Sequence, residues 1–153
     1  MTDLYDRYLQ NPKICTDTRK ITTECLFFAL KGPHFNGNEF AKEALKKGAS
    51  YAVVDDELHA IDDRYILVKD ALTSLQELAR FHRKKLKCKI LGITGSNGKT
   101  TSKELCLQVL KKKYNTLATS GNLNNHIGVP LSILSIGTDT EIAIIEMGAN
   151  HLN

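Results

Sequence analysis

Residues 89–101 read Lys89-Ile90-Leu91-Gly92-Ile93-Thr94-Gly95-Ser96-Asn97-Gly98-Lys99-Thr100-Thr101. The first six residues form a short, largely apolar run that is typical of a buried β-strand. The next glycines mark a loop, and a helix is predicted after it. Strand, glycine loop and helix in this order favour an α/β fold with a parallel sheet. The apolar face expected on the helix consists of Leu105, Cys106, Val109 and Leu110.

The loop has the chemistry of a phosphate-binding site. Gly95 and Gly98 allow consecutive backbone N–H groups to face an anion, and the helix N-terminus adds its positive dipole end. Lys99 would reach the β- and γ-phosphates of ATP, and the hydroxyl of Thr100 would be a ligand of Mg²⁺. Because the strict motif has a glycine where this chain has Ile93, a plain turn with a helix cap is the alternative. The predicted nucleotide-binding residues are Gly95, Ser96, Asn97, Gly98, Lys99, Thr100 and Thr101.

Two further strands are expected after the loop, at residues 115–118 and 141–146, with a short helix opened by Pro130 between them. The last strand is continuously apolar up to its final residue, as expected for a parallel strand covered on both faces. Glu146 ends that strand, so its carboxylate would stand at the carboxyl edge of the sheet, where such folds bind ligands. We predict that Glu146 is a second Mg²⁺ ligand, with a solvated strand end as the alternative.

The first half of the chain predicts a smaller α/β unit. Strands are expected at residues 26–30, 51–54 and 65–68, with a helix between the first two that stops at Gly48. A second helix is expected to begin after Asp70, a suitable N-cap. The residues at helical spacing are Phe40, Ala44 and Leu45 in the first helix and Leu72, Leu75, Leu78, Ala79 and His82 in the second.

We place the domain boundary near Lys87, which predicts one domain at residues 1–87 and a second at residues 88–153. A doubly wound sheet needs helices on both faces and more strands than the second domain supplies. The second domain is therefore expected to be incomplete, and the chain to be an amino-terminal fragment.

Composition narrows the class of protein. The net charge is +4, with 42% hydrophobic and 25% charged residues, as in a soluble globular protein. Lysines cluster at residues 84–87 and 111–113, where helices should end, so a helix-dipole role is favoured over nucleic-acid binding. No run of residues could act as a signal peptide or a membrane span, which predicts a cytoplasmic protein. The four cysteines lie far apart and are expected to be reduced thiols rather than metal ligands.

Several motifs together resemble one family, the Mur ligases, over essentially the whole chain. The phosphate loop is common to that family and to folylpolyglutamate synthetases, which carry it near the amino terminus, whereas here a complete small unit precedes it. One departure is Thr18, where the family usually has serine; the hydroxyl is kept. The matching motifs are Thr16-Asp17-Thr18-Arg19, Leu26-Phe27-Phe28-Ala29-Leu30-Lys31-Gly32, residues 94–101, Gly121-Asn122-Leu123-Asn124-Asn125-His126-Ile127-Gly128-Val129-Pro130 and Glu146-Met147-Gly148-Ala149-Asn150.

The resemblance implies a fold and an activity. The first domain would bind the UDP part of a substrate, and the second would begin a P-loop domain that binds ATP and Mg²⁺. The motifs at residues 121–125 and 146–150 imply an ATP-dependent ligase that joins D-alanyl-D-alanine to UDP-N-acetylmuramoyl tripeptide, in peptidoglycan synthesis, through an acyl phosphate. A fragment of this length would be inactive alone. Small-molecule substrates, neither nucleic acid nor a membrane, and a monomeric state are expected.

The resemblance also implies roles for particular residues. Lys99 and Glu146 would be catalytic, Asp17, Thr18 and Arg19 would contact the UDP end, and Asn122 and Asn125 would orient the substrate. Arg19 could instead form a structural ion pair, His126 could lie in the substrate cleft or a surface loop, and His151 could approach the metal region. Two other functions stay open: a sister ligase that adds the third peptide residue, and a nucleotide-binding module without ligase activity.

Overall fold

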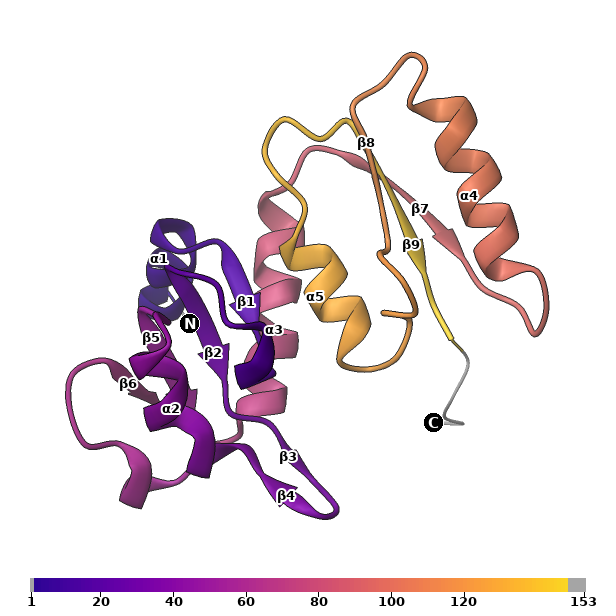
Figure 1. Cartoon of the computed structure of the whole chain (residues 1–153). Helices are drawn as coiled ribbons and strands as arrows, with labels where there is room; N and C mark the ends of the chain where they lie inside the picture. Colours follow the sequence, from indigo (N-terminus) through magenta and orange to yellow (C-terminus); the bar gives the residue numbers. More distant parts are fainter. Residues whose placement is uncertain (1, 149–153) are drawn as a thin grey trace. The chain divides into compact units, whose positions relative to one another are not determined.

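The computed structural model describes residues 2–148, which form two compact units (Figure 1). The units divide between Leu78 and Ala79, within the helix α3 (Ala71–Lys85), rather than at the expected boundary at residue 87. The physical reason is that the C-terminal half of α3 packs in the second unit, where buried His82 shares a 3.0 Å hydrogen bond between its Nε2 and the carbonyl of Ile136. A functional domain that ends at residue 87 stays a prediction.

The first unit is built on a four-stranded parallel sheet in the order β1-β2-β5-β6. Its strands are β1 (Lys13–Cys15), β2 (Cys25–Phe28), β5 (Tyr51–Val54) and β6 (Tyr65–Leu67), so the three strands predicted here are confirmed and β1 is an addition. The helix α2 (Ala41–Lys46) packs on one sheet face, and Gly48 follows it with a φ of 111°, which explains why the helix stops there.

The first unit also contains elements that were not predicted: an N-terminal helix, a small hairpin and short 3-10 helices. The helix α1 (Thr2–Gln10) buries Leu4, Tyr5 and Tyr8. A small antiparallel hairpin joins β3 (Lys31–Gly32) to β4 (Phe35–Asn36). Asp70 caps α3 as expected, since its carboxylate accepts a 2.6 Å hydrogen bond from the backbone N–H of Thr73. The short 3-10 helices are η1 (Thr18–Lys20), η2 (Gly37–Phe40) and η3 (Glu57–His59).

The second unit is a three-stranded parallel sheet in the order β7-β9-β8. Its strands β7 (Lys89–Ile93), β8 (Thr116–Ala118) and β9 (Ile142–Glu146) confirm the three predicted strands. The helices α4 (Lys99–Leu110) and α5 (Gly128–Leu134) connect them and lie on opposite faces of the sheet (Figure 1), as right-handed crossovers require. The central strand β9 is buried, as its apolar run predicted.

Two expectations about packing in the second unit were wrong. The side chains of Leu105 and Val109 on α4 are 64% and 70% exposed, and the residue of this helix that is fully buried is Lys103. The strand β7 is also half-exposed, since β9 is its only strand partner within residues 2–148. The apolar pattern identified both elements, but their burial depends on neighbouring elements that a local pattern does not show.

Two general features of the described residues concern the cysteines and the length of the helices. All four cysteines are free thiols, with Cys25 and Cys88 buried and Cys15 and Cys106 half-buried. Within residues 2–148, no helix combines the length and the apolar character needed to cross a lipid bilayer.

Candidate active site

The loop between β7 and α4 has the backbone shape of an anion cradle. Gly95 and Gly98 have φ values of 137° and 76°, in a region that side chains disfavour, so glycine is required at both turns. Gly98 is the N-cap of α4 and its carbonyl accepts from the N–H of Ser102, which starts the helix ladder directly behind the loop. The first N–H groups of α4 therefore remain available for an anion at the loop.

Lys99 lies over this loop. Its ammonium group donates hydrogen bonds to the backbone carbonyls of Gly95 and Ser96, the second at 3.4 Å. These carbonyls hold a positive charge at the mouth of the cradle, on the first residue of α4. A phosphate group in the cradle would find that charge already in place.

Strand register brings Glu146 to the same loop. Ile93, the last residue of β7, pairs with Glu146, the last residue of β9, so the carboxylate stands where the loop leaves the sheet. The Thr100 hydroxyl donates to its two oxygens at 3.1 and 3.3 Å, and the Asn124 carboxamide donates to Oε1 at 2.8 Å. The solvated strand-end alternative is thereby excluded, because Glu146 is only 1% exposed.

The environment of Glu146 keeps its carboxyl group ionised. Burial by itself raises the pKa, but the hydrogen bonds from Asn124 and Thr100 and the positive charges of Lys103 and Lys99 outweigh it. The pKa of Glu146 therefore lies below its usual range. A carboxylate, rather than a neutral acid, faces the Thr100 hydroxyl.

The paired oxygens of Thr100 and Glu146 fit the needs of Mg²⁺. This ion takes hard oxygen ligands and usually keeps several waters and substrate phosphate oxygens around one or two protein ligands. Within residues 2–148, no group of three or more histidine, cysteine or acidic side chains could enclose a metal. Two protein oxygens suit a cation whose other ligands are waters and phosphate oxygens.

The asparagine-rich segment reaches Glu146 through a residue that was not predicted. Asn122 and Asn125 were predicted to orient the substrate, and for both this role stays a prediction. The Asn125 carboxamide oxygen accepts from the N–H groups of Ile127 and Gly128 at the start of α5. The asparagine that reaches Glu146 is Asn124. Asn122 and His126 are exposed, and their roles stay predictions. The cluster was visible in the sequence, but which asparagine turns toward Glu146 depends on the path of the loop.

Sequence reasoning also missed Lys103 and Thr119, which both contact Glu146. The backbone N–H of Glu146 donates to the Thr119 hydroxyl at 3.0 Å, and the Lys103 ammonium donates to the Thr119 carbonyl at 2.8 Å. The only sequence signal was the spacing of Lys103, four residues after Lys99 and thus one turn along the same helix.

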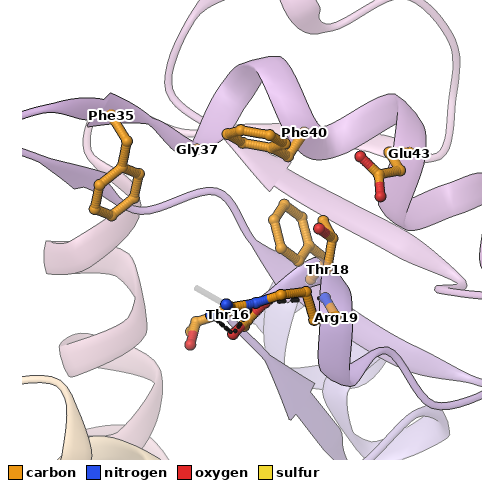
Figure 2. A pocket seen from close by; sticks show the side chains of 9 residues that line it. Thr16, Thr18, Arg19, Phe35, Gly37, Phe40 and Glu43 are labelled. Carbon is orange, nitrogen blue, oxygen red and sulfur yellow. Dashed lines mark hydrogen bonds and ion pairs between the residues drawn. The ribbon is translucent and has the colours of Figure 1, made fainter.

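A separate pocket of about 450 Å³ lies in the first unit (Figure 2). Residues 16–19 line one side, and the aromatic rings of Phe35 and Phe40 lie across from Arg19. Gly37 lines the pocket as well, and a Cβ atom there would come within 2.3 Å of the Leu30 carbonyl oxygen. The three predicted UDP-contacting residues, Asp17, Thr18 and Arg19, are therefore brought together at one concave site.

Arg19 forms an ion pair with Asp17, the alternative that the sequence left open. Its Nε lies 2.9 and 3.1 Å from the two carboxylate oxygens and its Nη2 lies 2.7 Å from Oδ2. The hydrogen bonds from Arg19 hold the pKa of the Asp17 carboxyl well below its usual range. Because the Arg19 side chain is 85% exposed, solvent screens the pair and it contributes little to stability.

A buried carboxylate anchors the hairpin that carries the aromatic side of the pocket. Asp55 follows β5 and accepts a 2.8 Å hydrogen bond from the Asn38 carboxamide and a 3.1 Å bond from the N–H of Ala71. Lys31, at the base of the hairpin, forms a 2.9 Å ion pair with the same carboxylate. Asn38 in turn accepts from the N–H of Asp55 at 3.0 Å. This network ties residues 31–38 to the end of the sheet.

The Asp55 network predicts a pH dependence of stability. Burial raises the pKa of Asp55, but the hydrogen bonds from Asn38, Lys31 and Ala71 outweigh it, so the folded-state pKa is lower than the unfolded one. The stabilisation is then present above the unfolded pKa, near pH 4, and is lost as the pH falls further. Asp55→Asn should lower the free energy of unfolding at pH 7 by about 2 kcal/mol and flatten its decline below about pH 4.

Urea unfolding of both proteins at pH 7 and at about pH 3 measures this effect. Asp63→Asn is the matched control, because Asp63 is an exposed aspartate of the same unit. If Asp55→Asn and Asp63→Asn behave alike at both pH values, the Asp55 carboxylate does not anchor the hairpin.

Two motif residues, Ala149 and Asn150, and His151 lie outside the described residues, so their predicted roles are untested by the structure.

Comparison with known proteins agrees with the geometry of both units. The family model "Mur ligase family, catalytic domain" matches residues 13–83, and "Mur ligase middle domain" matches residues 93–153. The chain is 43% identical to UDP-N-acetylmuramoyl-tripeptide--D-alanyl-D-alanine ligase of Bacillus subtilis over 88% of its own length and 30% of that protein. For the same enzyme of Escherichia coli the identity is 42%, covering 99% of this chain and 34% of the relative.

A solved structure is also similar. MurF ligase from Thermotoga maritima, in complex with ADP, aligns with a TM-score of 0.80 and 34% identity, covering 94% of this chain and 33% of that one. The chain therefore spans about a third of the length of the relatives it matches. Two family models match in succession, the identity extends over nearly the whole chain, and the fold is shared. This chain therefore belongs to the Mur ligase family.

Proposed function

We propose that the protein containing this chain joins D-alanyl-D-alanine to UDP-N-acetylmuramoyl tripeptide at the expense of ATP. The observation that carries the proposal is the contact of Thr100 with Glu146 beside the glycine loop, with Lys99 over the loop. Identity above 40% to two ligases named for this reaction supports the choice of substrates. In this proposal residues 1–87 bind the UDP end and residues 88–153 begin the ATP-binding domain.

The chemistry is a phosphoryl transfer followed by acyl transfer. The terminal carboxylate of the tripeptide attacks the γ-phosphorus of ATP, which forms an acyl phosphate and releases ADP. The amine of D-alanyl-D-alanine then attacks the acyl carbon, loses a proton and expels inorganic phosphate. Such reactions are accelerated mainly by positioning and by neutralising the charge on the transferring group.

Each loop residue has a task in this scheme. The N–H groups at the start of α4 bind phosphate oxygens, and Lys99 neutralises charge on the β- and γ-phosphates. Thr100 and Glu146 would hold Mg²⁺, which when bound draws charge from the phosphate oxygens. Asn124 orients the Glu146 carboxylate through its 2.8 Å hydrogen bond.

The pocket at residues 16–19 is proposed to hold the UDP part of the substrate. Its aromatic walls suit a base or sugar, and Arg19 suits a diphosphate, because guanidinium binds phosphate with paired hydrogen bonds. The ion pair with Asp17 engages Nε and Nη2 of Arg19, while Nη1 has no partner within residues 2–148. An exposed, screened pair can exchange one partner for a phosphate at little cost.

Replacing Arg19 with alanine is expected to weaken binding of UDP-muramoyl tripeptide by about ten- to a hundredfold, the value of one charge-assisted hydrogen bond. Titration calorimetry of this chain with the ligand, with and without the substitution, measures the change. Arg64→Ala is a matched control, because Arg64 forms an ion pair with Asp62 at the same two-residue spacing and does not line the pocket.

The outcomes of this titration separate two claims. No binding by the unaltered chain at millimolar ligand would contradict the UDP pocket. Binding that survives Arg19→Ala, with the pocket still occupied, would show that the Asp17–Arg19 pair is structural.

A sister ligase that adds the third residue of the peptide is the second candidate. It would require UDP-muramoyl dipeptide and a free amino acid instead of UDP-muramoyl tripeptide and D-alanyl-D-alanine. Assay of a complete ligase containing this sequence with each pair of substrates decides between them, by the release of inorganic phosphate. Release of phosphate with only the dipeptide acceptor and amino acid would overturn the proposal.

A further inference from the structure

The second unit contains a buried cation whose role is not explained by phosphate binding. Lys103 lies on α4, one turn after Lys99, and is only 1% exposed. An inward position of an amphipathic helix ordinarily holds an apolar residue, and a buried ammonium group needs paired charges and hydrogen bonds to be tolerated. An apolar side chain of similar length would fill this position without that requirement. Stability alone therefore does not account for a lysine here.

The contacts of Lys103 converge on the carboxylate of the candidate metal site. Its ammonium lies 3.7 Å from Oε2 of Glu146 and donates to the Thr119 carbonyl at 2.8 Å. Thr119 is itself hydrogen-bonded to the backbone N–H of Glu146 at 3.0 Å. Lys103 thus joins α4 to the ends of β8 and β9 and approaches Oε2 of Glu146, the oxygen that also accepts from Thr100 at 3.1 Å.

Two positive charges oppose the one negative charge of the Glu146 carboxylate. They are the ammonium of Lys103, at 3.7 Å, and that of Lys99 at the loop, and both favour the ionised carboxylate. Glu104 also approaches Lys103, at 3.3 Å, but its side chain is about half-exposed. A free divalent cation arriving beside Thr100 would meet one carboxylate that is already neutralised by a buried neighbour. Nucleotide phosphates would supply the missing negative charge.

We propose that Lys103 is a resident counter-ion of Glu146. Lys103 holds the Glu146 carboxylate in place, and its charge makes the site accept a divalent cation only together with nucleotide phosphates. This inference rests on the proposed nucleotide function. Lys103 acts through Glu146 and is a positioning residue. Its consequence is that metal and nucleotide bind as one complex, and that neither stays tightly bound after the other leaves.

The test is the binding of Mn²⁺, as a spectroscopic substitute for Mg²⁺, to this chain with and without ADP. Electron paramagnetic resonance of the free ion gives the affinity. In the unaltered chain, ADP should tighten the binding of Mn²⁺. The resulting affinity should exceed the affinity of Mn²⁺ for ADP without the chain. Lys103→Met should bind Mn²⁺ without nucleotide at least about tenfold more tightly, because a neighbouring positive charge is removed.

Two further variants separate a local effect from a change in net charge. Lys103→Arg keeps the charge and should bind Mn²⁺ within a few-fold of the unaltered chain. Lys111→Met removes one charge from an exposed position just after α4 and should leave the nucleotide-free affinity unchanged. A tightening in both methionine variants would contradict the local role of Lys103.

One outcome overturns the counter-ion role and leaves the proposed function standing: the Lys103→Met chain folds and binds ADP, but its affinity for Mn²⁺ is unchanged or weaker. Loss of ADP binding by the unaltered chain overturns the proposed function instead. If Lys103→Met does not fold, the unaltered chain decides the matter: Mn²⁺ binding that is equally tight with and without ADP overturns the proposal, and binding that requires ADP supports it.

Discussion

Replacing Lys99 with alanine is expected to lower the rate of ATP-dependent ligation at least about a hundredfold in a complete ligase containing this sequence. The ammonium group is held over the loop by the carbonyls of Gly95 and Ser96, so it is already in place when charge develops on the transferring phosphate. An alanine leaves that charge uncompensated in a preorganised site. The measurement is the initial rate of phosphate release with all three substrates present.

The fold should survive this change, because Lys99 makes hydrogen bonds only to its own loop within the described part of the chain. Lys111→Ala, at an exposed position just after α4, is the matched control for the loss of one charge. If a well-folded Lys99→Ala enzyme has near-normal turnover, residues 98–100 form only a turn and a helix cap and do not bind phosphate.

Glu146→Gln should have the second large effect, on both metal use and stability. The amide is nearly the same size as the carboxylate but has no charge, so the affinity for Mg²⁺ in the presence of nucleotide should fall about tenfold or more. The activity optimum should move to higher Mg²⁺ concentration. The buried Lys103 loses its ion pair at the same time, which should lower the free energy of unfolding by about 3 kcal/mol.

Mg²⁺ titration of ligase activity and urea unfolding measure these two effects separately. Glu104→Gln is the control, because it also removes a carboxylate beside Lys103 but from a half-exposed side chain. If the activity of Glu146→Gln depends on Mg²⁺ concentration in the same way as that of the unaltered enzyme, Glu146 stabilises the fold but does not bind the metal.

Periodic patterns predicted most of the secondary structure. The strands β2, β5, β6 and β9 and the helix α3 were located by apolar runs, helical spacing and the Asp70 cap, all of which act over a few neighbouring residues. The strand β1 has only three residues and was missed, because its pairing with β2 is a contact between distant parts of the chain. Local propensity carries no signal for such pairing.

The candidate site was predicted where chemistry is encoded in consecutive residues. The loop from Gly95 to Thr101 and the strand-end position of Glu146 follow from the motif and from the rule that parallel strands end at one edge. Asn124, Lys103 and Thr119 were missed, since each meets Glu146 through a side-chain direction set by packing. A lysine in an apolar helix pattern has the same appearance in sequence whether it is solvated or buried.

By itself the sequence determined the α/β class, the order of the main elements, the phosphate loop and the Mur ligase family, because glycine positions, apolar runs and motifs act locally and are read directly from the chain. Only the tertiary structure decided that Leu105 and Val109 face solvent while Lys103 is buried, and that Arg19 pairs with Asp17 at the pocket. It also decided that Asn124 is an asparagine that reaches Glu146. Burial and charge pairing depend on which distant segments meet, and that is a property of the packed chain.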